Sequence, residues 1–113
     1  MLSGKTDIVK ELNKILPTYY ELFCDSNTKL PCFTYIENIN EDVVTGDTLG
    51  YSSIGYTIKL WANDVADIDR YSNKADIVMR KLGYRRKSSN ELTVDNQIEK
   101  IMTYEALGLE KYE

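Results

Sequence analysis

The sequence predicts an α+β fold in which two amphipathic helices pack on one face of a mostly antiparallel sheet of about five strands. Three observations support this prediction. The chain has 113 residues, which suits one domain spanning residues 1–113. Apolar residues recur at helical spacing in two separate segments. The segments between and after them are rich in β-branched and aromatic residues. The expected order is α-β-β-β-α-β-β.

The first element is an amphipathic helix over about residues 5–16. Its apolar residues follow i, i+4, i+7 spacing and form one stripe, with polar residues outside it. Asp7 lies in the first turn, where a negative charge suits the helix dipole. Pro17 ends the helix because it cannot continue the hydrogen-bond ladder. The stripe consists of Ile8, Val9, Leu12, Ile15 and Leu16.

Two strands are expected next, over residues 18–24 and 32–38 and antiparallel to each other. Both are rich in aromatic residues, and the turn-forming sequence Asp25-Ser26-Asn27-Thr28 separates them. Cys24 and Cys32 flank this turn. They are either two buried thiols in a reducing compartment or a disulfide across a wide hairpin.

Residues 39–50 are predicted to form a long acidic loop. The segment contains Glu41, Asp42 and Asp47 together with two glycines. Long connections of this kind tend to be functional, and these acids do not follow the spacing of a calcium-binding loop. The loop is therefore expected to be solvated or to be ordered by a partner.

Residues 51–61 show the alternation of a half-buried strand. Ile54, Tyr56, Ile58 and Leu60 are expected on the core face. Trp61 ends this strand on the polar face. It either packs under the following helix or anchors a protein interface.

The second helix is expected within residues 62–82. Asn63 or Asp64 can cap its start, Arg80 and Lys81 occupy its last turn, and Gly83 follows as the residue that ends it. One buried stripe is expected, formed by Ile68, Tyr71, Ala75, Val78 and Leu82.

The remaining chain is predicted as a strand over residues 84–87, a turn at 88–91 and a strand over 93–104. Residues 97–109 also have the periodicity of a helix, and the strand assignment follows the resemblance described below. Residues 106–113 are expected to form a short C-terminal tail.

No catalytic or cofactor-binding constellation is visible in the sequence. Histidine is absent, which removes the commonest general base and metal ligand. The glycines do not form a nucleotide-binding loop, and two cysteines alone do not make a standard zinc site. We therefore expect no enzyme activity, no cofactor and no bound metal.

The charge and hydropathy of the chain also exclude some classes of partner. A net charge of −4 argues against a general phosphate-binding surface. No apolar run approaches the roughly 20 residues that span a bilayer, and the N-terminal segment lacks the apolar stretch of a secretory signal. The expected compartment is the cytoplasm.

Candidate contact residues come from the charged segments and the tryptophan. The basic run in residues 80–87 is unusual in an acidic chain. It is either a solvated edge strand that discourages aggregation or a patch that meets acidic residues of a neighbouring copy. The candidates are Glu41, Asp42, Asp47, Trp61, Asp64, Asp67, Arg85, Arg86 and Lys87.

Four short patterns occur in order along the chain. They are Pro17-Thr18-Tyr19, Pro31-Cys32-Phe33-Thr34-Tyr35, the strand 56–61 and Gly83-Tyr84-Arg85-Arg86. With the preceding helix and the acidic loop, this order resembles the tail-completion and tail-terminator (head-tail joining) proteins of long-tailed bacteriophages and prophages. The similarity covers roughly residues 6–105.

The resemblance implies a structural virion protein that forms a homo-oligomeric ring, usually a hexamer. Such a ring ends the tail tube and joins it to the head connector. The implied partners are other copies of the chain, the tail tube protein and the connector, without a membrane or a specific nucleic acid. The implied location is the host bacterial cytoplasm during assembly and then the virion tail or neck. The alternative function is a small cytoplasmic ligand-binding or regulatory α+β domain.

Overall fold

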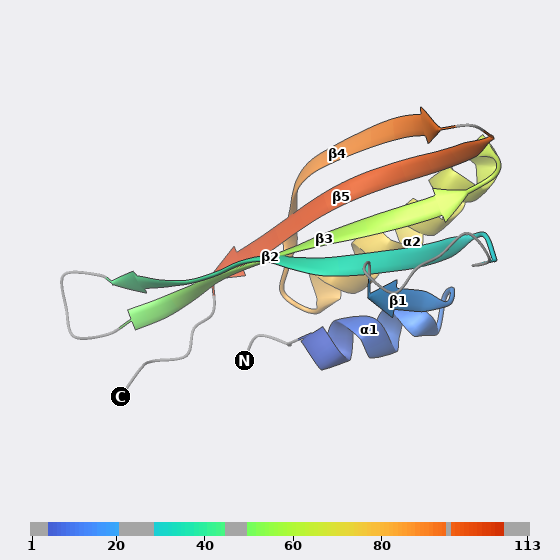
Figure 1. Cartoon of the computed structure of the whole chain (residues 1–113). Helices are drawn as coiled ribbons and strands as arrows, with labels where there is room; N and C mark the ends of the chain where they lie inside the picture. Colours follow the sequence, from blue (N-terminus) through green and yellow to red (C-terminus); the bar gives the residue numbers. More distant parts are fainter. Residues whose placement is uncertain (1–4, 21–28, 45–49, 95, 108–113) are drawn as a thin grey trace.

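The computed structural model describes residues 5–20, 29–44, 50–94 and 96–107. Its elements follow the predicted order (Figure 1). They are α1 (Lys5–Asn13), β1 (Thr18–Tyr20), β2 (Cys32–Val44), β3 (Gly50–Ala62), α2 (Val65–Lys81), β4 (Arg85–Val94) and β5 (Gln97–Leu107).

The described strands form one five-stranded sheet in the order β1-β2-β3-β5-β4. β1 is parallel to β2, and every other neighbouring pair is antiparallel. The two helices lie on the same side of this sheet (Figure 1). The predicted α+β class and the mostly antiparallel sheet are therefore confirmed.

The core lies between the helices and one face of the sheet. Ile8 and Leu12 of α1 and Ile68 of α2 are fully buried, as the spacing predicts, in one cluster with alternate residues of β3. Ile58 and Leu60 are also fully buried, and Tyr56 is nearly so. Burial of this apolar surface is the main favourable contribution to folding.

Several tyrosines belong to this core, which accounts for part of the high tyrosine content. Tyr56, Tyr84 and Tyr104 are all buried. The rings of Tyr56 and Tyr84 meet edge to face with their centroids 5.6 Å apart. Among the tyrosines whose side chains are described, Tyr19 is the most exposed, at 37%.

The first helix ends earlier than its apolar stripe suggests. α1 ends at Asn13. Leu16 lies beyond the helix but still donates its N–H to the Leu12 carbonyl at 3.1 Å. The Asn13 side chain accepts the Thr18 N–H at 3.0 Å, which fixes the start of β1. Leu16 remains buried, so the last predicted stripe residue still serves the core.

The predicted antiparallel pairing of the first two strands is wrong. β1 runs parallel to β2, with Thr18 opposite Phe33 and Tyr20 opposite Tyr35. The eleven-residue connection from Tyr20 to Cys32 is close to the dozen residues that a crossover between parallel strands needs. Cys24 lies outside the described residues, and Cys32 is buried, so the pairing of the two cysteines stays open.

The predicted loop at residues 39–50 is wrong where the structure describes it, because residues 39–44 belong to β2 and Gly50 to β3, while residues 45–49 lie outside the described residues. β2 and β3 pair from Cys32–Trp61 to Val44–Gly50, with a register shift between Glu37 and Ile39. The glycines and acids of this segment favoured a loop, but its β-branched residues continue both strands. Asp47 lies outside the described residues.

The β2–β3 hairpin extends beyond the rest of the sheet (Figure 1). β1 pairs with β2 only as far as Tyr35, and β5 pairs with β3 only as far as Ser53. We call residues 39–44 of β2 with residues 50–53 of β3 the arm, and the remaining elements the body. The arm contributes to an elongated shape with principal extents of 51 × 24 × 24 Å.

The second helix follows the sequence prediction closely. Asp64 caps it by accepting the Asp67 N–H at 2.8 Å, and Gly83 follows its end with a φ of 98°, a conformation that favours glycine. Ile68 and Ala75 are fully buried, as predicted. Ser72 and Met79 are also buried, because the contact face extends to one side of the predicted stripe.

The last two strands form a longer hairpin than predicted. The predicted turn at 88–91 is wrong, because these residues belong to β4 and pair with β5. Val94 pairs with Gln97, so residues 95 and 96 connect the two strands. β5 runs to Leu107, which confirms a strand rather than a helix in this segment. The predicted tail at residues 106–113 therefore begins later than expected, and residues 108–113 lie outside the described residues.

Candidate interaction surfaces

The sheet face opposite the helices carries Trp61. Its neighbours Leu60 and Ala62 are fully buried in the core, so strand alternation places Trp61 on the other face. The indole Nε1 donates a hydrogen bond to the Thr34 hydroxyl at 3.0 Å. Thr34 is fully buried although no described helix covers this face. Trp61 therefore packs on the sheet itself rather than under α2.

The same face holds an ion pair with little solvent exposure. The Lys59 ammonium lies 3.4 Å from the Glu99 carboxylate, and the side chain of Glu99 is only 10% exposed. Leu92, opposite Glu99 in the sheet, is 49% exposed. This mixture of a tryptophan, a sheltered ion pair and an exposed leucine is typical of surfaces that contact other proteins.

The basic segment Arg85–Lys87 lies at the start of β4, an edge strand. Arg85 and Lys87 each lie 3.4 Å from the carboxylate of Glu105 on β5. Their side chains nevertheless remain 79% and 50% exposed. Two cations share one carboxylate here, so positive charge remains available to a partner.

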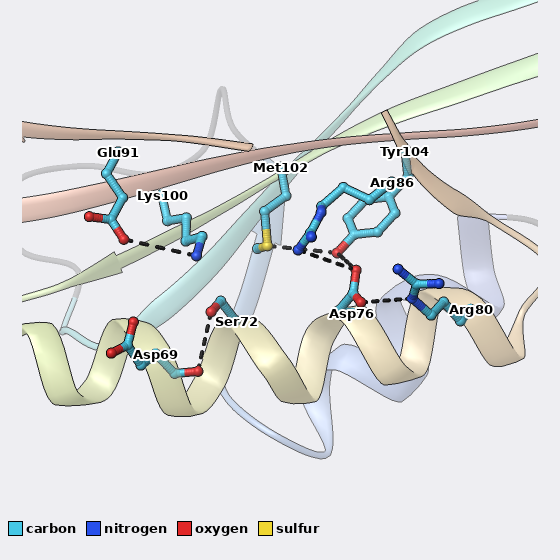
Figure 2. A network of polar contacts seen from close by, with 9 residues as sticks. All are labelled: Asp69, Ser72, Asp76, Arg80, Arg86, Glu91, Lys100, Met102 and Tyr104. Atoms are coloured by element: carbon cyan, nitrogen blue, oxygen red, sulfur yellow. Dashed lines mark hydrogen bonds and ion pairs between the residues drawn. The ribbon is translucent and has the colours of Figure 1, made fainter. Parts of the chain in front are cut away.

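Arg86 points to the helix side of the sheet instead. It lies 3.7 Å from Asp76 of α2, and Arg80 donates to the other oxygen of Asp76 at 2.8 Å (Figure 2). The Tyr104 hydroxyl donates to Asp76 at 3.1 Å and lies 3.6 Å from the Met102 sulfur. This network connects α2 to β4 and β5, so Arg86 has a structural role in addition to its charge.

The surroundings of Asp76 and Tyr104 shift their acidities in opposite directions. Burial raises the pKa of Asp76, but the hydrogen bonds from Arg80 and Tyr104 and the charge of Arg86 outweigh it and lower the pKa below 3.8. Burial, together with the charge of Asp76, raises the pKa of Tyr104. The pair therefore stays as a carboxylate and a neutral phenol at neutral pH.

A second tyrosine site lies near the base of the arm. The Tyr56 hydroxyl lies 3.5 Å from a carboxylate oxygen of Glu37. Burial and the charge of Glu37 raise the pKa of Tyr56 to about 12. This phenol is therefore protonated at neutral pH and is poorly suited to act as a base.

The acidic residues at the start of α2 have local structural roles. Asp64 is the helix cap, and Asp67 pairs with Arg70 three residues later. Arg70 also lies over the ring of Tyr71, 4.8 Å from its centroid. Asp64 and Asp67 therefore contribute to the stability of α2, and they lie at the end of the body remote from the basic segment.

The sheet register places the start of the arm and the basic segment at the same level along the strands. Arg85 pairs with Glu105, Glu105 with Gly55, and Gly55 with Ile39. The basic segment thus begins at the level where the arm begins, on the opposite edge of the sheet. Glu41 and Asp42 lie two and three residues further along the arm.

No protein-family model and no curated protein matches this chain. In the described residues, no group of three or more histidine, cysteine, aspartate or glutamate side chains is arranged to hold a metal ion. The two described helices lack the length and apolar character needed to cross a membrane.

Sequence reasoning identified the basic segment but missed its partners. Its partners Asp76 and Glu105 were not among the candidates, and neither was Glu99, the partner of Lys59. The i, i+4 spacing of Asp76 and Arg80 is visible in the sequence and indicates a helix-surface pair. The contacts of Glu105 and Glu99 depend on the strand register, which the sequence alone did not provide.

Proposed function

We propose that this protein is a structural subunit that assembles with copies of itself into a ring, as part of the tail of a long-tailed phage or prophage. In this role it ends the tail tube and contacts the head connector. It acts through its surfaces and catalyses no reaction. The phage context comes from the order of sequence patterns, and the self-assembly comes from the charged edge described above.

The single observation that carries the self-assembly is the exposed basic segment of an otherwise acidic chain. Arg85 and Lys87 share Glu105 and remain at least half exposed, while the chain has a net charge of −4. An acidic surface of another copy complements such a segment. Charge complementarity of this kind sets the orientation of partners and speeds their encounter.

The sheet face that no described helix covers supports a second contact, with the tube or the connector. Trp61 and Leu92 offer apolar area next to the sheltered Lys59–Glu99 pair. Tryptophans in such positions often contribute a large part of the binding energy.

Light scattering across a concentration series tests the self-assembly. The wild-type protein is expected to form one discrete species of several copies, and its dissociation constant is expected to rise with salt because exposed charges are screened. A chain that stays monomeric at its highest attainable concentration and at low salt contradicts the proposal.

A matched pair of variants tests the basic segment. R85E/K87E is expected to weaken assembly at least about tenfold, since it reverses charge at the contact. K5E/K29E makes the same change in net charge at two exposed lysines outside this segment and is expected to leave assembly unchanged. Equal effects of the two variants would show that only net charge matters.

A further inference from the structure

We propose that residues 39–44 of the arm pair with the free edge of β4 in a neighbouring copy and so extend its sheet. The occupant of the β4 edge is thus a second copy of this chain. This inference rests on the self-assembly proposed above and adds the surfaces and the mode of bonding.

The two edges required for this pairing are both open among the described strands. β4 is the last strand of the sheet order and pairs only with β5. On the other side, β1 covers β2 only up to Tyr35, which leaves residues 39–44 paired with β3 alone. Each open edge presents backbone N–H and C=O groups that another strand can satisfy.

Among the described strands, the outer part of the arm is supported only by the pairing of β2 with β3. Beyond Ser53, among the described strands, only β2 and β3 pair. Isolated two-stranded hairpins are at best marginally stable in water, whereas a third strand gives independent stability. Pairing with β4 of another copy supplies that third strand.

The charges of the two edges are complementary. Residues 39–44 include Glu41 and Asp42 and contain no basic residue. β4 begins with Arg85, Arg86 and Lys87, and residues 85–93 of this strand are all exposed. Opposite charges on adjacent strands favour pairing, so this edge accepts an acidic strand better than a basic one.

The register makes the contact geometrically simple. Ile39 lies on the same transverse row of the sheet as Arg85, and Glu41 and Asp42 follow two and three residues later. A shift of two or three residues along the strand direction, about 7–10 Å, brings these acids beside the basic segment of the next copy. Because β1 already covers Phe33–Tyr35 on the same edge of β2, this pairing is confined to the first residues of β4.

The two edges lie at opposite sides of one sheet, which determines the type of assembly. Each copy donates an arm at one edge and accepts an arm at the other. Contacts of this heterologous type repeat from copy to copy and close into a ring when the rotation permits. A symmetric dimer through two β4 edges would instead leave both arms unused.

The first test shortens the arm. Replacing residues 41–53 with Asn-Gly joins Asn40 to Ile54, which are paired in the hairpin. This variant is expected to melt within a few degrees of the wild type and to stay monomeric. The matched control replaces residues 45–49 with Asn-Gly, which joins the paired residues Val44 and Gly50 and keeps both arm strands. It is expected to assemble like the wild type.

The second test exchanges the charges. E41K/D42K is expected to weaken assembly at least about tenfold, as is R85E/K87E. In an equimolar mixture, both contacts between unlike copies are complementary, because the basic arm of one variant meets the acidic β4 of the other and the native acidic arm meets the native basic β4. The mixture is therefore expected to assemble with the two variants in alternation, whereas neither variant assembles alone.

The outcomes separate this inference from the proposed self-assembly. If the wild type assembles and the shortened variant assembles equally well, the arm inference is wrong and self-assembly stands, with a symmetric β4 dimer as one explanation. If the wild type never assembles, the proposed self-assembly is wrong. Failure of the exchanged pair to associate, with both variants folded, would contradict the assigned contact.

Discussion

The two halves of the β2–β3 hairpin have different surroundings. In the body, Phe33, Ile58 and Leu60 are fully buried beneath the helices, and flanking strands continue the sheet. In the arm, the flanking strands stop one after another, until β2 and β3 pair only with each other among the described strands. One hairpin therefore contributes to the core at one end and extends beyond the described flanking strands at the other.

Removal of a core side chain is expected to have the largest effect on the body. Ile58→Ala should lower the free energy of unfolding by about 2–5 kcal/mol, because it removes buried contacts and leaves a cavity. Urea unfolding followed by circular dichroism measures this loss. The arm-shortened protein should lose much less of its free energy of unfolding than Ile58→Ala. An equal loss would show that the arm belongs to the folding core.

The network at Asp76 is expected to give an intermediate effect on the body. Tyr104→Phe removes the hydroxyl that donates to Asp76 and should cost about 1–2 kcal/mol of unfolding free energy. Assembly of the folded protein should be unchanged, since Tyr104 is buried. A large loss of assembly without a loss of stability would place this network at the contact.

The same network predicts a dependence of stability on pH. The folded-state pKa of Asp76 is lowered, so its ionised form stabilises the folded protein above the ordinary carboxyl pKa near 3.8. That contribution is lost as the pH falls through the lowered value. The stability difference between the wild type and Asp76→Asn should therefore be greatest near neutral pH and shrink in acid. A difference that stays constant from pH 7 to pH 2 would contradict this assignment.

The helix cap is expected to give the smallest of these effects. Asp64→Ala should lower the unfolding free energy by about 1 kcal/mol, because the Asp67 N–H loses its acceptor. Assembly should be retained, since Asp64 lies away from the arm and from the basic segment Arg85–Lys87 at the start of β4. Weakened assembly in the folded variant would restore Asp64 as a contact residue.

The sequence predicted the elements whose signals are local. The second helix has an aspartate cap, one apolar stripe and a glycine at its end, and all three agree with the structure. The alternation from Ile54 to Leu60 likewise predicted which face of β3 is buried. These features depend on residues close together in the chain, so one sequence is sufficient to find them.

The errors concern properties that depend on distant partners. The direction of β1 is set by its pairing with β2, and the turn-forming residues before Cys32 suggested a hairpin instead. The glycines and acidic residues of the arm led to the prediction of a loop, although Ile39, Val43 and Val44 are good strand formers. The serines of β4 suggested a turn, whereas the connection lies at residues 95 and 96.

The basic segment was predicted only in part, because its contacts also depend on residues distant in the sequence. Composition was enough to single out Arg85–Lys87, because a basic run is conspicuous in an acidic chain. The division of this run was not predictable, since it depends on the strand register. Arg85 and Lys87 form ion pairs with Glu105, whereas Arg86 pairs with Asp76 on the helix side of the sheet.

Amide hydrogen exchange at low and high protein concentration tests the proposed pairing of the arm with the β4 edge most directly. Body amides, such as those of Ile58 and Met102, should be protected at both concentrations. The outward-facing amides of residues 39–44 and of β4 should exchange rapidly in the monomer and become protected together in the assembled protein. Arm and β4 amides that gain no protection on assembly would contradict the pairing of these two edges.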